Sequence, residues 1–215
     1  MSRNVAVVGA TGAVGQEMLR VLEQRRFPVG ELRLLASERS AGTRMAFRGR
    51  EVAVEALERA EFGGVDVALF SIGAELALQH GPRAAAAGAL VVDNSTAFRM
   101  DPRVPLVVPE VNGELLAGRP AIVANPNCCA VPLVQVLHAL RPLAALRRVV
   151  VTTFQSVSGT GKEAMDELRE QTGSYLAGSE TPPRVYSQPI AFNCFPHVDQ
   201  FLPNGYTKEE WKVAE

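Results

Sequence analysis

The chain has 215 residues and a formal net charge of −1, from 22 lysine and arginine residues against 23 aspartate and glutamate residues. Because 47% of its residues are hydrophobic and 21% are charged, it can bury a core and is not disordered as a whole. The even charge balance argues against nucleic acid or a membrane surface as a partner, and no apolar run is long enough to span a bilayer. A predicted strand follows Met1 almost at once, which leaves no room for a signal peptide, and the three cysteines form no disulfide framework. These features predict a cytoplasmic protein.

The first part of the chain alternates short apolar runs with segments of helical spacing. Strands that are separated by helices of this length predict βαβ units, a parallel sheet and right-handed crossovers. We therefore expect residues 1–126 to form a doubly wound, Rossmann-type domain. Its predicted strands are Asn4–Val8, Glu31–Ala36, Val65–Phe70, Ala89–Val92, Leu106–Val108 and Ala121–Ala124, and its predicted helices are Val14–Gln24 and Ala74–Ala87.

The pattern changes after a turn at Asn125–Asn127, and residues 127–215 are expected to form an α+β catalytic and dimerisation domain. An apolar helix is predicted over Cys128–Leu140 and a long β-branched strand over Arg147–Phe154, typical of a larger sheet. Thr207-Lys208-Glu209-Glu210 fits a capping box, with Thr207 as N-cap and Glu210 at N3. The helix that it announces should continue, yet the chain stops at Glu215, so we expect this domain to be incomplete on its C-terminal side.

A glycine-rich segment, Gly9–Gly15, follows the first predicted strand and opens the first helix, which is the context that a dinucleotide-binding loop requires. Gly9 permits the tight turn, Gly12 lets the backbone approach a pyrophosphate, and Gly15 lets helix and strand pack closely. The helix N-terminus adds free N–H groups and partial positive charge. An ordinary glycine-rich turn is the alternative. The predicted cofactor-binding residues here are Gly9, Thr11, Gly12, Ala13 and Val14.

The second predicted strand ends in Ala36-Ser37-Glu38-Arg39-Ser40. An NAD-specific site usually has an acidic residue here that holds the ribose hydroxyls, whereas Arg39, flanked by Ser37 and Ser40, fits a 2′-phosphate. These residues predict NADP rather than NAD as the cofactor. Glu38 would repel the phosphate if it pointed inward, and a solvated polar turn is the alternative interpretation.

Two adjacent cysteines, Cys128 and Cys129, follow Asn125-Pro126-Asn127 where a strand meets a helix. A thiol at a helix N-terminus ionises more readily to the nucleophilic thiolate. Two small buried core residues are the alternative. A thiolate beside a hydride acceptor suits aldehyde oxidation, in which attack gives a thiohemiacetal, hydride leaves and a thioester remains. The sequence thus predicts Cys128 as a nucleophile.

Several segments occur in an order that resembles the bacterial aspartate-semialdehyde dehydrogenase family, and the resemblance covers essentially the whole chain. They are Gly9–Gly15, Asn94–Met100, Val108–Asn112, Asn125–Cys128, Gln155–Gly159 and Glu209–Lys212. The implied reaction is the reversible conversion of 4-phospho-L-aspartate and NADPH to L-aspartate 4-semialdehyde, phosphate and NADP, on the route to lysine, threonine and methionine. The resemblance also implies a homodimer or tetramer and no metal.

The resemblance assigns further roles. Cys128 would form the acyl-enzyme, and Gln155 would orient the substrate. Ser158 and Gly159 would line the nicotinamide side of the cofactor. Contacts to substrate or phosphate are implied for Arg99, Asn127, Gln155, Glu209 and Lys212. A surface salt bridge is the alternative for Arg99, and a plain i, i+3 ion pair is the alternative for Glu209 with Lys212.

The family's catalytic histidine has no counterpart among His80, His138 and His197. We therefore expect the chain alone to be inactive or nearly so. Two other functions stay open at this point: a related N-acetyl-gamma-glutamyl-phosphate reductase, which has the same thiol chemistry, and a non-catalytic NADP-binding fragment.

Overall fold

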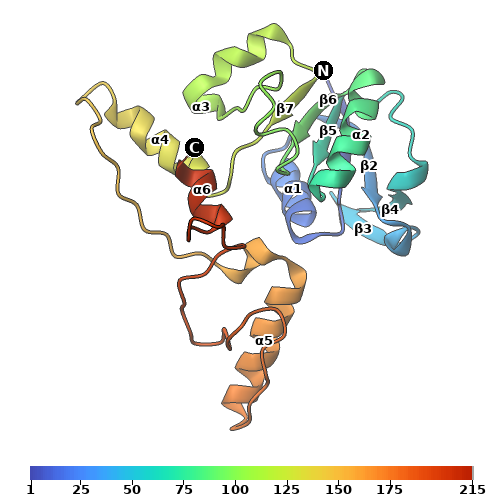
Figure 1. The fold of residues 1–215 in the computed structure, drawn as a ribbon. Helices are drawn as coiled ribbons and strands as arrows, with labels where there is room; N and C mark the ends of the chain where they lie inside the picture. The colour runs from blue at the N-terminus through green and yellow to red at the C-terminus, as the bar shows by residue number, and fades with distance from the viewer. Residues whose placement is uncertain (215) are drawn as a thin grey trace. The chain divides into compact units, whose positions relative to one another are not determined.

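The computed structural model describes residues 1–214 as two compact units, Met1–Ala145 and Leu146–Glu215 (Figure 1). Glu215, the last residue of the chain, lies outside the described residues. The first unit contains the sheet, and the second is built on one long helix. Among the helices in this part of the chain, none is both long and apolar enough to cross a lipid bilayer.

A seven-stranded sheet in the order β3-β4-β2-β1-β5-β6-β7 forms the centre of the first unit. All neighbouring strands pair in parallel except β3, which runs antiparallel to β4 at one edge. The chain leaves β1 toward β2 on one side and later returns to β5 on the other, so the topological switch point lies at the carboxyl end of β1. This arrangement confirms the predicted doubly wound fold. The strands are β1 Arg3–Val8, β2 Val29–Ala36, β3 Arg44–Phe47, β4 Arg50–Ala56, β5 Val67–Phe70, β6 Leu90–Asp93 and β7 Ile122–Ala124.

Strand β1 is apolar without alternation because both faces of the sheet are covered. Val5 and Val7 pack in one core cluster with Leu19 of helix α1 (Ala13–Gln24), whereas Ala6 and Val8 pack in a second cluster with residues of α2 (Ala74–Ala86). Successive side chains of a strand point to opposite faces, so α1 covers one face and α2 the other. These two cores hold the carboxyl end of β1 in place.

The β3–β4 hairpin was not predicted. Its strands are half-exposed and rich in arginine and glutamate, so they lack the apolar run by which the other strands were found. Phe47 pairs with Arg50 across a two-residue turn, and both turn residues, Arg48 and Gly49, have positive φ. Two positive φ angles match the twist of a tight hairpin. The hairpin extends the sheet beyond β2.

The predicted strand Leu106–Val108 is wrong. Leu106 forms a single parallel bridge to Ala124, and Val108 already precedes helix α3 (Pro109–Asn112). Proline lacks an N–H and favours the first position of a helix, so Pro109 ends the extended segment. Strand β7 forms the edge of the sheet instead.

The apolar helix predicted over Cys128–Leu140 forms as α4 (Ala130–Leu140). None of its residues is fully buried, and the side chain of Val136 is 57% exposed. Strong apolar character therefore predicted the helix correctly but not its burial in this unit.

The predicted strand Arg147–Phe154 is also wrong. Residues 147–154 have no strand structure, and Val150 and Phe154 are 78% and 86% exposed. A β-branched run becomes a strand only where a neighbouring strand accepts its hydrogen bonds. Within the described residues of the second unit, the β contact is a single bridge between Phe201 and Thr207, so no partner strand is available.

Helix α5 (Lys162–Leu176) organises the second unit through a buried polar face. Glu167 is fully buried, and its carboxylate accepts hydrogen bonds from the backbone N–H groups of Arg184 and Val185 at 2.7 and 2.6 Å. One turn later, Gln171 donates to Glu167 at 3.4 Å and accepts from the N–H of Ile190 at 2.8 Å. Glu167 and Gln171, one helical turn apart, thus supply the hydrogen-bond acceptors for backbone N–H groups of the loop at residues 184–190.

Candidate active site

The glycine-rich loop lies at the carboxyl end of β1, at the switch point of the sheet. The N–H groups of Gly9 and Ala10 donate to the carbonyl of Leu35 in β2, at 2.8 and 3.1 Å. Gly12 is the N-cap of helix α1, so Ala13 and Val14 form its first turn. The loop therefore aims the free N–H groups of a helix start at the place where open α/β sheets bind their ligands.

Each glycine of the loop has a different steric reason. Gly9 has φ +87°, and a Cβ there would lie 2.1 Å from the carbonyl oxygen of Ser71. A Cβ on Gly15 would lie 2.1 Å from the carbonyl oxygen of Gly9. A Cβ on Gly12 would approach that same oxygen at 3.3 Å and is otherwise open. The loop is thus a cradle with one side open, and it fits a dinucleotide pyrophosphate.

The turn after β2 forms the next part of this edge. Ser37 precedes the short 3-10 helix η1 (Glu38–Ser40), and the hydroxyl of Thr11 lies 3.5 Å from that of Ser40. The side chain of Arg39 is exposed, and it makes no hydrogen bond or ion pair within residues 1–214. The carboxylate of Glu38 instead binds the guanidinium of Arg59 at 2.6 Å. An arginine and two serines are therefore present where a 2′-phosphate would be expected.

The start of helix α4 carries the candidate nucleophile. The side-chain oxygen of Asn127 accepts from the N–H groups of Cys129 and Ala130, at 2.8 and 3.2 Å. The carbonyl of Asn127 also accepts from the N–H of Val131 at 3.1 Å, so Asn127 caps the turn at Cys128 and Cys129 that leads into α4, whose N-cap residue is Cys129. Cys128, in this turn, is exposed. Its thiol is both accessible and close to the positive end of the helix dipole.

Arg99 joins the ends of two neighbouring strands. Its Nε donates to the carbonyl of Asn125 after β7 at 2.8 Å, and its Nη2 donates to the carbonyl of Asn94 after β6 at 3.0 Å. The amide of Asn125 donates to the side-chain oxygen of Asn94 at 2.7 Å. Arg99 is therefore held at the carbonyl of Asn125, which lies three residues before Cys128 in the sequence.

Asp93 at the end of β6 was not singled out from the sequence. It is fully buried, its Oδ2 accepts from the hydroxyl of Ser95 at 2.7 Å, and its Oδ1 has no partner within the described residues. Burial raises the pKa of Asp93 above its ordinary value, although the Ser95 hydrogen bonds and the positive charge of Arg99 oppose the rise. The Ser95 hydroxyl also accepts from the N–H of Ala97 at 3.0 Å. Asp93 thereby fixes the loop that carries Arg99.

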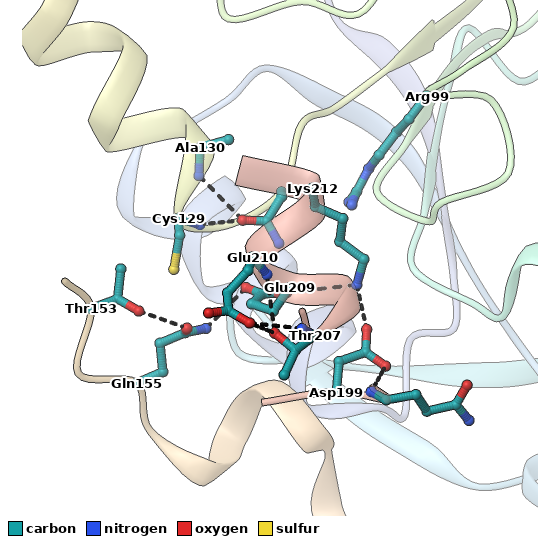
Figure 2. Close-up of polar contacts among 12 residues, drawn as sticks. Arg99, Cys129, Ala130, Thr153, Gln155, Asp199, Thr207, Glu209, Glu210 and Lys212 are labelled. Atoms are coloured by element: carbon teal, nitrogen blue, oxygen red, sulfur yellow. Dashed lines mark hydrogen bonds and ion pairs between the residues drawn. The ribbon is translucent and has the colours of Figure 1, made fainter. Parts of the chain in front are cut away.

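The other predicted site residues belong to the second unit. The Gln155 amide donates to Glu209 at 3.1 Å and accepts from the hydroxyl of Thr153 at 3.0 Å (Figure 2). Ser158 and Gly159 are exposed residues of the 3-10 helix η4 (Val157–Thr160), where the N–H of Ser158 donates to the hydroxyl of Ser156. The structure thus brings Gln155 and Glu209 together, 54 residues apart in sequence.

Helix α6 (Lys208–Ala214) begins with the predicted capping box. The N–H of Thr207 donates to Glu210 at 2.7 Å, and the N–H of Glu210 donates back to the Thr207 hydroxyl at 3.2 Å. The Thr207 contacts lower the pKa of the Glu210 carboxyl. Helix α6 therefore starts where the sequence predicted.

Lys212 has a partner that the sequence did not reveal. Its ammonium lies 2.6 Å from the carboxylate of Asp199 and 3.6 Å from that of Glu209. Burial works to raise the pKa of Asp199, but hydrogen bonds from Lys212 and the N–H of Gln200 outweigh it, and the net shift is downward. The i, i+3 contact of Glu209 with Lys212, considered as the alternative to a role in binding substrate, is present, but the shorter contact is to Asp199. No local sequence signal links Asp199 to Lys212, because a turn at Gly205 brings them together.

Each of the three histidines has a structural setting. His80 is buried on α2, where burial and then Arg83 lower its pKa, and its Nδ1 lies 3.1 Å from an Arg83 nitrogen. His138 is exposed on α4. His197 stacks on Phe201, with ring centroids 4.7 Å apart.

A doubly wound sheet with a glycine cradle at its switch point, and an exposed cysteine at a capped helix start, define a dinucleotide-binding protein that carries a candidate nucleophilic thiol. Residues 4–119 match the family described as semialdehyde dehydrogenase, NAD binding domain, and residues 137–215 match semialdehyde dehydrogenase, dimerisation domain. The chain therefore belongs to the semialdehyde dehydrogenase family.

Relatives give the family a closer definition. Aspartate-semialdehyde dehydrogenase 2 of Vibrio cholerae is 50% identical over 213 residues, which are 98% of this chain and 63% of the relative. The crystal structure of aspartate semialdehyde dehydrogenase II complexed with ASA, from the same organism, matches with a TM-score of 0.94 at 49% identity, over 99% of this chain and 64% of that one. The Candida albicans enzyme with NADP matches with a TM-score of 0.59 at 26% identity, over 66% of this chain and 48% of that one. The chain thus spans just under two thirds of the bacterial relatives named here. Their names favour the aspartate enzyme over N-acetyl-gamma-glutamyl-phosphate reductase.

Proposed function

We propose that this protein is an NADP-dependent oxidoreductase that interconverts L-aspartate 4-semialdehyde and 4-phospho-L-aspartate, a reaction on the route to lysine, threonine and methionine. Residues 1–126 would bind the cofactor, and residues 127–215 would carry the thiol chemistry and contacts between subunits. The observation that carries the proposal is the exposed Cys128 thiol at the Asn127-capped start of α4, in the same unit as the glycine cradle.

Cys128 would act as the nucleophile. Its thiolate adds to the aldehyde carbon and forms a C–S bond, while the aldehyde oxygen becomes an alkoxide. Loss of hydride from that carbon restores the carbonyl and leaves a thioester on Cys128. Bound NADP would supply the acceptor for this hydride, which carries both electrons of the oxidation. Phosphate oxygen then attacks the thioester carbonyl, and the Cys128 thiolate leaves.

The remaining site residues would bind and orient the reactants. Arg99, whose guanidinium donates to two strand-end carbonyls, would hold phosphate through charge-assisted hydrogen bonds. In the second unit, Glu209 offers a carboxylate for the substrate amino group, and its contact with the Gln155 amide fixes both side chains. Lys212 would hold phosphate. Asn127 would support the substrate and the helix start together.

The cofactor preference rests on the turn after β2. Arg39 is exposed there beside Ser37 and Ser40, and Glu38 binds Arg59. A relative from Candida albicans has a structure with NADP. We propose that Arg39 binds the 2′-phosphate and that Ser158 and Gly159 contact the nicotinamide half.

We further propose that this chain turns over slowly, because none of its histidines matches the family's general base. General acid–base help typically contributes about 10²–10⁴-fold. The test is phosphate-dependent reduction of NADP by L-aspartate 4-semialdehyde, followed at 340 nm, beside the Vibrio cholerae relative. Comparable specific activity would show that another group serves as base.

The nucleophile is tested in the same assay. Cys128→Ser should abolish the residual rate without changing NADPH affinity, since the thioester cannot form. Cys129→Ser is the matched control and should keep most of the rate, because the next residue of a helix points about 100° away. If the two variants exchange these results, Cys128 is not the nucleophile.

A further inference from the structure

The carboxyl edge of the sheet places three loops in a row. Strand β2 lies between β1 and β4, and both pairings are parallel, so the three strands end at the same edge (Figure 1). Ala36 pairs with Ala56, which puts the turn after β2 beside the turn after β4. The glycine cradle follows β1, on the opposite side of β2. The turn that follows Ala36 therefore lies between the cradle and the turn after β4.

The turn after β2 divides its side chains between these two neighbours. On the β1 side, the hydroxyl of Ser40 lies 3.5 Å from that of Thr11 in the cradle. On the β4 side, the carboxylate of Glu38 binds Arg59 at 2.6 Å. Arg59 is the last residue of the 3-10 helix η2 (Leu57–Arg59), directly after β4. The negative side chain is thus drawn away from the strand that carries the cofactor loop.

This arrangement answers the conflict in the sequence between Glu38 and a 2′-phosphate. A phosphate held by Arg39 would lie near Glu38, because Glu38 directly precedes Arg39 in the sequence. A carboxylate that rotated toward it would repel it and would accept hydrogen bonds from ribose hydroxyls, the interaction that NAD-specific sites use. Glu38 could act as such an acidic residue unless another group holds it.

We propose that Arg59 is a specificity-determining residue for the cofactor, because it holds Glu38 on the β4 side and leaves Arg39 and Ser40 to the 2′-phosphate. The proposal rests on the proposed use of NADP. Arg59 acts through Glu38 and does not itself contact the cofactor. Its side chain is 78% exposed and that of Glu38 56%, so the effect is moderate and weakens as salt screens the pair.

The test is a double-mutant cycle with Arg59→Ala and Glu38→Gln in the full chain, read as dissociation constants for NADPH and NADH at low ionic strength. Binding is measured by nucleotide fluorescence, so no turnover is required. In the wild-type background, Arg59→Ala should weaken NADPH about fivefold and NADH less than about twofold, as expected for one exposed like-charge contact. In the Glu38→Gln background, Arg59→Ala should leave the NADPH to NADH ratio within about twofold.

Two further variants control the cycle. Arg59→Lys keeps a cation for Glu38 and should retain the wild-type ratio. Arg3→Ala removes an arginine of another exposed ion pair, with Asp66, at the opposite end of β1, and should leave both constants unchanged. Thermal unfolding of each variant checks that the fold is intact.

The possible outcomes distinguish failure of the proposed role of Arg59 from failure of the proposed use of NADP. If Arg59→Ala lowers NADPH affinity equally in the wild-type and Glu38→Gln backgrounds, Arg59 contacts the phosphate directly. If Arg59→Ala leaves the ratio of the NADPH and NADH dissociation constants unchanged in the wild-type background, the Glu38 carboxylate does not approach the 2′-phosphate. Either result overturns the inference and leaves NADP binding standing. A wild-type chain that binds neither nucleotide, or binds NADH more tightly, overturns the proposed NADP function together with the inference.

Discussion

Gly12 and Gly15 should separate cofactor binding from folding, although they are three residues apart in one loop. Gly12 has φ −72° and ψ 165°, a conformation that alanine adopts freely. Its added Cβ would meet one atom, the Gly9 carbonyl oxygen, at 3.3 Å. Gly12→Ala should therefore cost the fold about 0.5–1 kcal/mol, mostly because alanine is a poor N-cap. The methyl group would stand on the open side of the cradle, where the pyrophosphate must approach.

Gly15→Ala should instead destabilise the fold strongly. Its Cβ would lie 2.1 Å from the same carbonyl oxygen and 2.8 Å from the Cα of Ala10, so backbone must move. Overpacking of this kind costs about 1–3 kcal/mol or more, and the loop is anchored to Leu35 on its other side. We expect Gly15→Ala to lower the free energy of unfolding by about 3 kcal/mol or more.

Urea unfolding followed by circular dichroism measures the stability of each variant, and NADPH titration measures its affinity for the cofactor. For Gly12→Ala we expect a midpoint close to wild type and a loss of NADPH affinity of about tenfold or more, equal to about 1.4 kcal/mol. Unchanged NADPH affinity in a folded Gly12→Ala protein would refute the cradle as the pyrophosphate site. Wild-type stability of Gly15→Ala would refute the described contact between loop and helix.

Three other changes test separate parts of the account. Glu167→Ala should lower the unfolding free energy of the second unit by about 3 kcal/mol, because it removes a fully buried side chain and the acceptor of the backbone N–H groups of Arg184 and Val185. Glu170→Ala, which removes an exposed partner of the Arg184 side chain, should cost less than about 1 kcal/mol in the same urea titration. Burial raises the pKa of Asp93 in the folded state, so protonation of Asp93 stabilises the fold, and this stability is lost as the pH rises from near 3.8 through the folded pKa. Between pH 4 and pH 8, the urea midpoint of the wild type should therefore fall relative to that of Asp93→Asn. Midpoints that change in parallel for the two proteins would contradict this. Arg39→Ala should weaken NADPH at least about tenfold more than NADH in titrations, and equal losses would show that Arg39 is structural.

The features predicted correctly depend on neighbours in sequence. The glycine cradle needs only a strand, a tight turn and a helix start, and these occur together in Gly9–Gly15. The Thr207–Glu210 capping box is a contact between residues three apart, so its residue types were enough to place the start of α6.

The features that the sequence did not predict depend on hydrogen-bond partners, ion-pair partners or burial supplied by residues far away in the sequence. Residues 147–154 have the composition of a strand, yet no strand lies beside them among the described residues of their unit, and hydrogen-bond partners cannot be read from composition. Pairing of β2 with β4 brings Glu38 to Arg59, and a turn brings Asp199 to Lys212. Asp93 looked like an ordinary strand end, because nothing local showed that its carboxyl is fully buried.

The central claim is that Cys128 forms a thioester with the substrate during cofactor reduction. Intact mass spectrometry tests it most directly after the purified chain is incubated with L-aspartate 4-semialdehyde and NADP without phosphate, quenched in acid, and mapped by peptide. The account predicts one added aspartyl group, located on Cys128, absent from Cys128→Ser, present in Cys129→Ser, and removed when phosphate is added. An adduct on Cys129 or Cys194, or none on Cys128 while NADPH accumulates, would contradict it.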